Sequence, residues 1–392
     1  MEQSHTTTED LDAWLKGLKE EYSHNSHIGD EKTGKPSHRL IAATHDLFGD
    51  DLEKEFITDY LAKASMAIPL KDQSLVLLNG GDLIAPEKNG SSAFPYQLLP
   101  QYFEKTRAGV YLRFQGRGIV INPGHHFLEH FHDVGLFIDG IDYVIVTSDA
   151  AEDEEEVKAI YDLNLKCNRQ KESVHVISYY LHQISYRNLV GQLKPQFKQE
   201  KGTVVPLSLF IDSQDLESIE LFDNASLYYG QLNGSADDAY AIRLDLKMRD
   251  SLFSIGYLTN PLSLYETRRL LGHCDALVQS FKQLQAQELY AQIAAFDFSN
   301  LQNDVRPFAW VLCDLPSQSG DKRLEWTKSI KKSLGNLQAH PLPGDIGLFL
   351  DLEKMRVKCT LSGTFAPLND IRVIRSKEPF GRLSYLSSDC YL

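Results

Sequence analysis

The most concentrated set of chemical groups in the chain is the acidic run that begins at Asp149. An apolar stretch, residues 143–146, leads into Thr147 and Ser148, and carboxylates then follow at Asp149, Glu152, Asp153, Glu154, Glu155 and Glu156. Carboxylate oxygens are the ligands that hard cations such as Mg²⁺ and Mn²⁺ prefer. Acids in the first turn of a helix also interact favourably with the helix dipole. The run therefore indicates either a hard-cation site at Asp149, Glu152 and Asp153 or a solvated helix start, and the missing Asp-x-Asp repeat favours the helix start.

A second set of metal-ligand residue types is a histidine cluster, HHFLEHFHD, which contains His125, His126, His130 and His132. On a helix, His126 and His130 would share a face, which is the spacing of a two-histidine ligand pair. A zinc enzyme also needs a third ligand and a catalytic base, and the order His-Glu-x-x-His is absent. The cluster is interpreted as structural or as part of the surface.

Ser148 is the only candidate nucleophile at a predicted strand end. A serine hydroxyl needs an adjacent base for activation, and no histidine lies nearby in the sequence. Gly-x-Ser-x-Gly, a phosphate-binding Walker loop and Gly-x-Gly-x-x-Gly are all absent. The sequence therefore predicts no serine-based or nucleotide-loop chemistry.

The elements that must position these groups begin with a helical region. Residues 1–68 contain a threonine cap, early acids and apolar residues at helical spacing, namely Leu11, Trp14, Leu15 and Leu18. No strand pattern interrupts this region. We expect a helical N-terminal extension over 1–68, a main domain over 69–354 and a small C-terminal appendage over 355–392.

The main domain reads as strands first and helices later. Two strands are expected around a turn at Gln115-Gly116-Arg117, with Gly116 and Gly118 supplying turn conformations. Further strands are predicted over 74–80, 141–148, 174–181, 203–211, 274–281 and 308–315, with a hairpin over 239–258 and helices over 152–169, 266–273 and 281–296. The pattern is neither doubly wound nor a TIM barrel, and indicates two mixed sheets covered by helices.

The order of these segments resembles the metallo-β-lactamase fold superfamily. The resemblance rests on Gly118-Ile-Val-Ile-Asn-Pro-Gly124, then a helix, then Gly140-Ile-Asp-Tyr-Val-Ile-Val-Thr147, and on Ser254-Ile-Gly-Tyr-Leu-Thr-Asn-Pro261 after a hairpin. It covers roughly residues 73–315 and implies an α+β fold, a four-layer αββα sandwich.

The resemblance also implies where metal ligands would stand, and the residues there differ from the family's Thr-His-x-His-x-Asp-His. Ser148 and Ala150 stand at the first two histidines, Glu152 at the aspartate and Asp153 at the last histidine. Two other substitutions are Asn260 at the bridging aspartate and Asn122 at the Asp of Asp-Pro-Gly. The segment 227–238, where a further histidine is expected, contains none. Serine and alanine cannot replace imidazole on zinc, so a dinuclear zinc hydrolase is not expected.

A similar loss is suggested near the C-terminus. Cys359-Thr-Leu-Ser362 and Ser387-Ser-Asp-Cys390 are spaced like the two halves of a zinc ribbon, with the inner cysteine of each half missing. Two thiolates and two hydroxyls would bind zinc poorly. The appendage is therefore interpreted as a degenerate zinc ribbon.

Composition sets the broad class. The formal charge of −14 disfavours non-specific nucleic-acid binding, and the mildly basic residues 194–201 are interpreted as a solvated loop. Five dispersed cysteines fit a reducing cytoplasm rather than a disulfide framework. No apolar run is long enough to cross a membrane, and the N-terminus does not have the pattern of a secretory signal.

These observations favour a catalytically degenerate protein that acts as a binding, scaffolding or regulatory subunit. We expect no cofactor, and a protein partner or a homo-oligomer. By resemblance to stand-alone members of the superfamily, a role in bacterial anti-phage defence is a further expectation. The alternatives are a Mg²⁺- or Mn²⁺-dependent phosphodiesterase or nuclease-like hydrolase with acidic ligands, and a sensor that uses its cleft only to bind a nucleotide or nucleic acid.

Overall fold

The computed structural model describes seventeen stretches of the chain: residues 50–78, 109–124, 126–148, 150–190, 207–209, 217–231, 240–249, 251–258, 274–280, 309–313, 327–328, 331–332, 340–344, 348–358, 366–368, 371–375 and 383–387. The chain divides into two compact units, Met1–Tyr60 and Leu61–Leu392, and every described strand belongs to the second. Helix α3, Asp50–Met66, confirms the helical prediction for the last part of residues 1–68. The rest of that predicted extension lies outside the described residues.

One sheet contains nine described strands, in the order β16-β15-β14-β1-β2-β3-β4-β5-β6. Their bounds are β1 Ser74–Leu78, β2 Gly109–Phe114, β3 Arg117–Ile121, β4 Tyr143–Val146, β5 Ser178–Leu181, β6 Leu207–Leu209, β14 Leu348–Asp351, β15 Arg356–Lys358 and β16 Ala366–Pro367. Strands β3 to β6 pair in parallel, and the remaining neighbours pair antiparallel. The carboxyl ends of β3, β4, β5 and β6 therefore lie at one edge of this sheet.

The second sheet contains seven described strands, in the order β13-β12-β11-β10-β9-β8-β7. Their bounds are β7 Glu217–Phe222, β8 Ala225–Gln231, β9 Tyr240–Lys247, β10 Leu252–Leu258, β11 Ala276–Ser280, β12 Ala309–Cys313 and β13 His340–Pro343. Here β7 to β10 form an antiparallel meander, and β10 to β13 pair in parallel. A separate hairpin joins β17, Ile371–Arg375, to β18, Leu383–Ser387.

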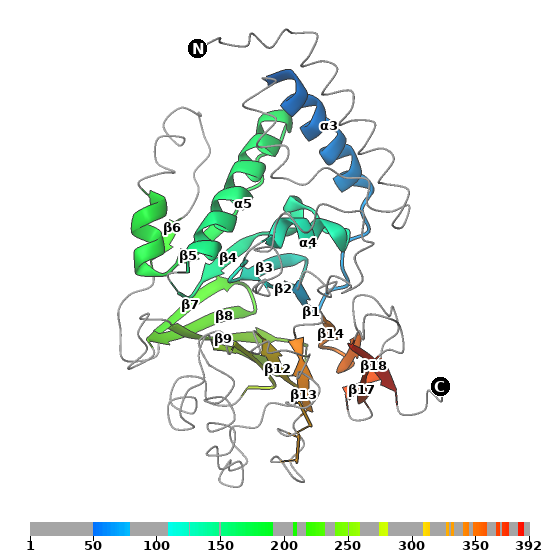
Figure 1. Ribbon diagram of the computed structural model, residues 1–392. Coiled ribbons are helices and arrows are strands. Elements are labelled where there is room, and N and C mark those ends of the chain that lie inside the picture. The colour runs from blue at the N-terminus through cyan, green and yellow to red at the C-terminus, as the bar shows by residue number, and fades with distance from the viewer. Residues whose placement is uncertain are drawn as a thin grey trace, which may run out of the picture. The chain divides into compact units, whose positions relative to one another are not determined.

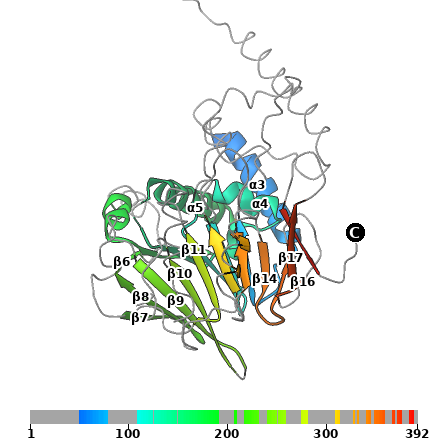
Figure 2. The ribbon, with the colours of Figure 1, turned by 60° about the horizontal axis from the view of Figure 1, so that its bottom comes forward.

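The core lies between the two sheets, which face each other in Figure 2. Because side chains alternate along a strand, Leu75 and Leu77 of β1 point into this core together with residues of the second sheet, whereas Val76 is buried on the opposite face. Strand β2 alternates in the same way between Leu112 and Tyr111. Both faces of the nine-stranded sheet are therefore covered.

Helices α4, Phe127–Asp133, and α5, Ala151–Gln170, cover the outer face of the nine-stranded sheet (Figure 1). The ring of Phe131 meets Tyr111 of β2 edge to face at 5.0 Å between centroids. A short 3-10 helix, η3, Ile138–Gly140, leads into β4, and the hydroxyl of Tyr111 donates a hydrogen bond to the Gly140 carbonyl at 2.7 Å. Aromatic packing therefore fixes the helical layer on the strands that carry the site.

The predicted α+β architecture is confirmed: two mixed sheets are stacked and flanked by helices, as in an αββα sandwich. Helix α5 agrees with its predicted bounds to within one residue at each end. Strand β5 is shorter than predicted because residues 174–177 are not paired, and the hairpin β7–β8 was missed. The predicted helices over 266–273 and 281–296 lie outside the described residues.

The predicted role of Gly118 is wrong. The left-handed residues of the β2–β3 turn are Gln115, with φ of 50°, and Gly116, with φ of 75°. Gly118 lies within β3, where an added Cβ would stand 1.7 Å from the Gly140 carbonyl oxygen. Position 118 therefore requires glycine because the backbone of Gly140 packs closely against it, whereas the turn itself is made by Gln115 and Gly116.

Strands β15 and β16 lie beyond residue 354 and extend the nine-stranded sheet, so the sheet continues into the predicted C-terminal appendage. The division of the chain at residue 354 stays a prediction. Cys359, Ser362 and Cys390 of the predicted ribbon lie outside the described residues.

None of the described helices is long and apolar enough to cross a membrane.

Candidate functional site

The candidate site lies where three parallel strands of the nine-stranded sheet end. Asn122 follows β3, Thr147 follows β4 and His182 follows β5, and all three side chains are buried. The carboxyl ends of parallel strands are where open α/β sheets bind ligands, because loops diverge there. The acidic run and the histidine cluster both belong to segments that leave this edge.

Asn122 and Thr147 form a reciprocal pair that joins β3 to β4. The Thr147 backbone N–H donates to Asn122 Oδ1 at 2.8 Å, and Asn122 Nδ2 donates to Thr147 Oγ1 at 2.7 Å. The Asn122 backbone is left-handed, with φ of 43°, and its N–H donates to the Ile145 carbonyl at 2.8 Å. Asn122 thus satisfies two buried groups of Thr147 and is part of the internal structure of the strand ends.

Ser148 is buried at the same edge of the sheet, and later segments of the chain donate hydrogen bonds to the backbone carbonyls of residues 147 and 148. Ser185 Oγ donates to the Ser148 carbonyl at 3.3 Å, and the Tyr240 backbone N–H donates to the Thr147 carbonyl at 2.9 Å. Since Tyr240 begins β9, the second bond ties the two sheets together at the strand end. Ser148, the candidate nucleophile that the sequence did not favour, therefore lies where hydrogen bonds connect the two sheets.

His182 is the residue at this edge that sequence reasoning missed. Its backbone N–H donates to the Val146 carbonyl at 2.9 Å, and its ring meets Tyr240 edge to face at 5.7 Å between centroids. The Ile184 N–H donates to His182 Nδ1 at 3.3 Å. Only the parallel pairing of β4 with β5 brings His182 beside the end of β4, so neither spacing nor motif could have revealed it.

The prediction that the acids at the start of α5 are solvated is wrong for two of them, Asp153 and Glu156. Asp153 is fully buried, and its Oδ1 accepts a hydrogen bond from the Gly124 N–H at 2.9 Å. Glu156 is also buried, and it accepts from the His126 N–H at 2.9 Å and the Leu128 N–H at 3.5 Å. These two carboxylates bind the loop between β3 and α4.

Two other acids of the run are more accessible. Glu152 is half-buried, and the half-buried Glu154 accepts hydrogen bonds from Asn188 Nδ2 at 3.1 and 3.2 Å. Asp149 lies outside the described residues, so a hard-cation site at Asp149, Glu152 and Asp153 stays a prediction.

The histidine cluster is only partly helical. His126 precedes α4 in a left-handed conformation, with φ of 61°, and its Nδ1 lies 3.0 Å from Glu129 Oε2. The rings of His126 and His130 are 6.5 Å apart between centroids. His126 is thus the residue that precedes α4, and His125 lies outside the described residues.

The described motif positions do not fit zinc. Ser148 offers a buried hydroxyl, Ala150 offers no ligand atom, and Asp153 Oδ1 is hydrogen-bonded to the backbone N–H of Gly124. Zinc in this fold would require imidazole nitrogens at about 2.0–2.1 Å. Within the part of the chain that the structure describes, no group of three or more His, Cys, Asp or Glu side chains is arranged to hold a metal ion. Asn260 and residues 232–238 lie outside that part.

The cysteines of the described segments are buried free thiols, Cys167, Cys274 and Cys313. Burial raises the pKa of Cys167 to about 12, and burial also raises the pKa of Cys274 to about 12. Since the thiolate is the nucleophile and metal ligand, neither of these two thiols is prepared for such chemistry near neutral pH.

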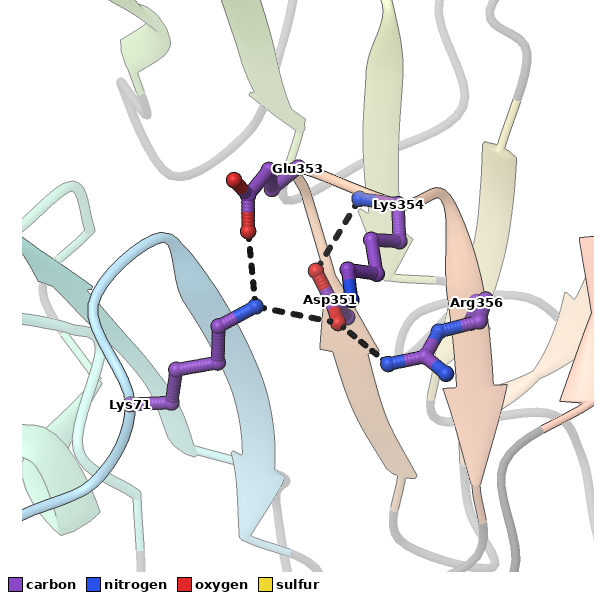
Figure 3. Close-up of polar contacts among 5 residues, drawn as sticks. All are labelled: Lys71, Asp351, Glu353, Lys354 and Arg356. Carbon is purple, nitrogen blue, oxygen red and sulfur yellow. Dashed lines mark hydrogen bonds and ion pairs between the residues drawn. The ribbon is translucent and has the colours of Figure 1, made fainter.

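The opposite edge of the same sheet is fastened by ion pairs. Asp351, at the end of β14, accepts hydrogen bonds from Arg356 at 2.9 Å, from the Lys354 N–H at 3.0 Å and from Lys71 at 3.4 Å (Figure 3). Lys71 also forms an ion pair with Glu353 at 2.8 Å. Burial acts to raise the pKa of Asp351, but these donors outweigh it and hold that pKa below its usual value.

Along the same edge, Asp142 accepts hydrogen bonds from Arg117 Nη1 at 2.7 Å and from the Gly118 N–H at 2.8 Å. The hydrogen bond that Arg117 donates to Asp142 and the negative charge of that carboxylate raise the pKa of Arg117. The ion pairs of this edge join strand starts and turns to one another. They stabilise the sheet, and the residues that follow β3, β4 and β5 remain the candidate site.

Comparison with known proteins gives structural matches only. No protein-family model and no curated protein sequence matches the chain. Among solved structures, the metallo-β-lactamase fold protein YhfI from Bacillus subtilis aligns with a TM-score of 0.45 and 10% identity over 70% of this chain and 98% of that one. A diphosphatase of the PhnP family aligns with a TM-score of 0.43 and 16% identity, over 71% and 96% of the two chains.

A long form of RNase Z from yeast aligns with a TM-score of 0.46 and 11% identity, over 72% of this chain and 42% of that one. These solved structures are similar to the chain at 10–16% sequence identity.

Proposed function

We propose that this chain works by binding a partner or ligand, as a scaffolding or regulatory protein, and does not hydrolyse a substrate through zinc. The observation that carries the proposal is the use made of Asp153. This residue stands at the last histidine of the resembled metal motif, yet it is fully buried and its Oδ1 accepts the Gly124 N–H at 2.9 Å. A carboxylate that holds its own loop in this way is part of the protein's internal structure.

The neighbouring positions support the same proposal. Asn122 is a neutral amide whose two polar atoms are both bonded to Thr147, so it brings no charge to the strand end. Ser148 is buried, and Ala150 has no ligand atom. Catalysis by zinc needs an open coordination position with a water whose pKa falls to about 7, which these residue types do not create.

The alternative of a hydrolase with Mg²⁺ or Mn²⁺ would need Asp149, Glu152 and Asp153 to converge on one cation. Asp153 Oδ1 instead accepts the Gly124 N–H, so this oxygen is already used within the protein. The hydrogen bond of Asp153 therefore supports the binding function better. An anti-phage role stays a prediction from the resemblance alone.

Turnover assays with defined metals test the proposal. The purified chain, stripped of metal and reloaded separately with Zn²⁺, Mn²⁺ or Mg²⁺, would be given phosphodiester, thioester and β-lactam substrates. We expect rates equal to those of buffer with the same metal. Turnover that requires one metal and that is lost on Glu152→Ala would establish the acidic-ligand hydrolase instead, while turnover unaffected by Glu152→Ala would still overturn the binding proposal.

A further inference from the structure

The described residues between β3 and α4, 122–124 and 126, include backbone conformations that are uncommon for residues other than glycine. Three of them have positive φ, namely Asn122 at 43°, Gly124 at 65° and His126 at 61°. Glycine adopts this conformation without strain, but asparagine and especially histidine do so at a cost. Such residues persist where the surrounding structure over-determines them. Something outside the loop must therefore fix it.

The fixing groups are two buried carboxylates on α5. Asp153 accepts the Gly124 N–H at 2.9 Å, and Glu156, on the next position along the same helix face, accepts the His126 N–H at 2.9 Å. Glu156 also lies 3.5 Å from the Leu128 N–H, in the first turn of α4. Hydrogen bonds from backbone N–H groups to carboxylates are stronger than those between neutral groups.

We propose that Asp153 and Glu156 form a metal-independent latch that holds Gly124 and His126 in their left-handed conformations and fixes the start of α4. A bound metal cross-links the segments that supply its ligands, so that folding and metal binding are coupled. Here α5 makes the cross-link to the β3–α4 loop with carboxylates of the chain itself. The motif positions do not fit zinc. Asp153, which stands at the last histidine of the resembled motif, instead attaches α5 to the loop between β3 and α4.

The latch makes a specific prediction for amide exchange. A hydrogen-bonded N–H exchanges only when its region opens, so exchange reports the strength of each attachment locally. Asp153→Ala should speed exchange of the Gly124 amide by about tenfold or more, because a buried N–H loses its acceptor. Glu156→Ala should do the same for the His126 amide. Asp153→Asn and Glu156→Gln keep one acceptor oxygen and should give intermediate exchange rates, because a neutral acceptor forms a weaker hydrogen bond than a carboxylate.

Residue-resolved exchange measured by NMR, together with the melting temperature with and without chelator, would decide the matter. The matched control is Glu154→Gln, which changes an acid in the same turn that bonds only a side chain among its described contacts, and which should leave both amides protected. If the alanine variants do not fold, the asparagine and glutamine variants give the same comparison at smaller amplitude. The latch is wrong if protection of Gly124 and His126 is unchanged in folded variants, or if chelator removes that protection in the unaltered protein. Hydrolytic turnover would contradict the proposed function without affecting this exchange result.

Discussion

Asn122 shows how a single side chain decides whether the strand end is a charged site or a neutral joint. Its amide supplies one donor and one acceptor, and both are used by Thr147 at hydrogen-bond distances of 2.7 and 2.8 Å. An aspartate could accept from the Thr147 N–H in the same way but would bring a charge into a fully buried place, at a substantial desolvation cost. The asparagine is therefore suited to a joint that holds no cation.

Asn122→Ala should lower the free energy of unfolding by about 2–4 kcal/mol. The change leaves two buried groups of Thr147 without their partner and puts an alanine in a left-handed conformation. The matched control is Asn224→Ala, because Asn224 is also left-handed, with φ of 70°, but is exposed in the β7–β8 turn. This control should cost about 1 kcal/mol, mainly from the backbone. Equal losses in urea unfolding for the two variants would show that the Thr147 pair contributes nothing.

At the scale of elements, periodicity in the sequence predicted the strands that cross the core and the long helix α5. These segments have a consistent apolar pattern, so local and tertiary preferences agree. The hairpin β7–β8 was missed because β7, at the sheet edge, is largely accessible and carries Glu217 and Glu220. His182 and the Asp153 attachment could not be predicted, since each depends on which strand or loop lies beside it in space.

Gly118→Ala should be much more damaging than Gly116→Ala, although both glycines belong to the same predicted hairpin. A Cβ on Gly118 would lie 1.7 Å from the Gly140 carbonyl and must displace backbone, whereas a Cβ on Gly116 meets nothing within 4 Å. We expect a loss of about 3 kcal/mol or more for Gly118→Ala from overpacking, and about 1 kcal/mol for Gly116→Ala from its positive φ. Thermal unfolding of both variants would measure the difference, and similar losses would mean that the β3–η3 contact yields easily.

The β14–β15 turn should show a defined pH dependence through Asp351. The donors Arg356, Lys354 and Lys71 hold its pKa below the usual value in the folded chain despite burial. A depressed folded pKa means that the stabilisation is fully present above the unfolded pKa of about 3.9 and is lost as pH falls through the folded pKa. Asp351→Asn should therefore reduce stability near neutral pH, and the gap to the unaltered protein should narrow as pH falls below about 4. A gap that stays constant from neutral to acid pH would exclude Asp351 as the titrating group.

At the scale of the whole molecule, the two opposite edges of the described nine-stranded sheet are held by different kinds of interaction. Ion pairs such as Asp351–Arg356 and Asp142–Arg117 close the edge where β3 and β4 begin. Where these strands end, bonds among Asn122, Thr147 and Tyr240 connect strand to strand and sheet to sheet. Because Asp153 is hydrogen-bonded to the loop between β3 and α4, we predict that the stability of the fold does not depend on a metal ion.

The most direct measurement of this claim is the metal content of the full chain, purified without chelator and without metal-affinity steps, by elemental analysis. We predict zinc, manganese and iron far below one ion per chain, and a melting temperature that a chelator leaves unchanged, because no ion binds selectively to the native state. Near-stoichiometric metal, with a melting temperature that falls on chelation and recovers when the same metal is returned, would contradict it.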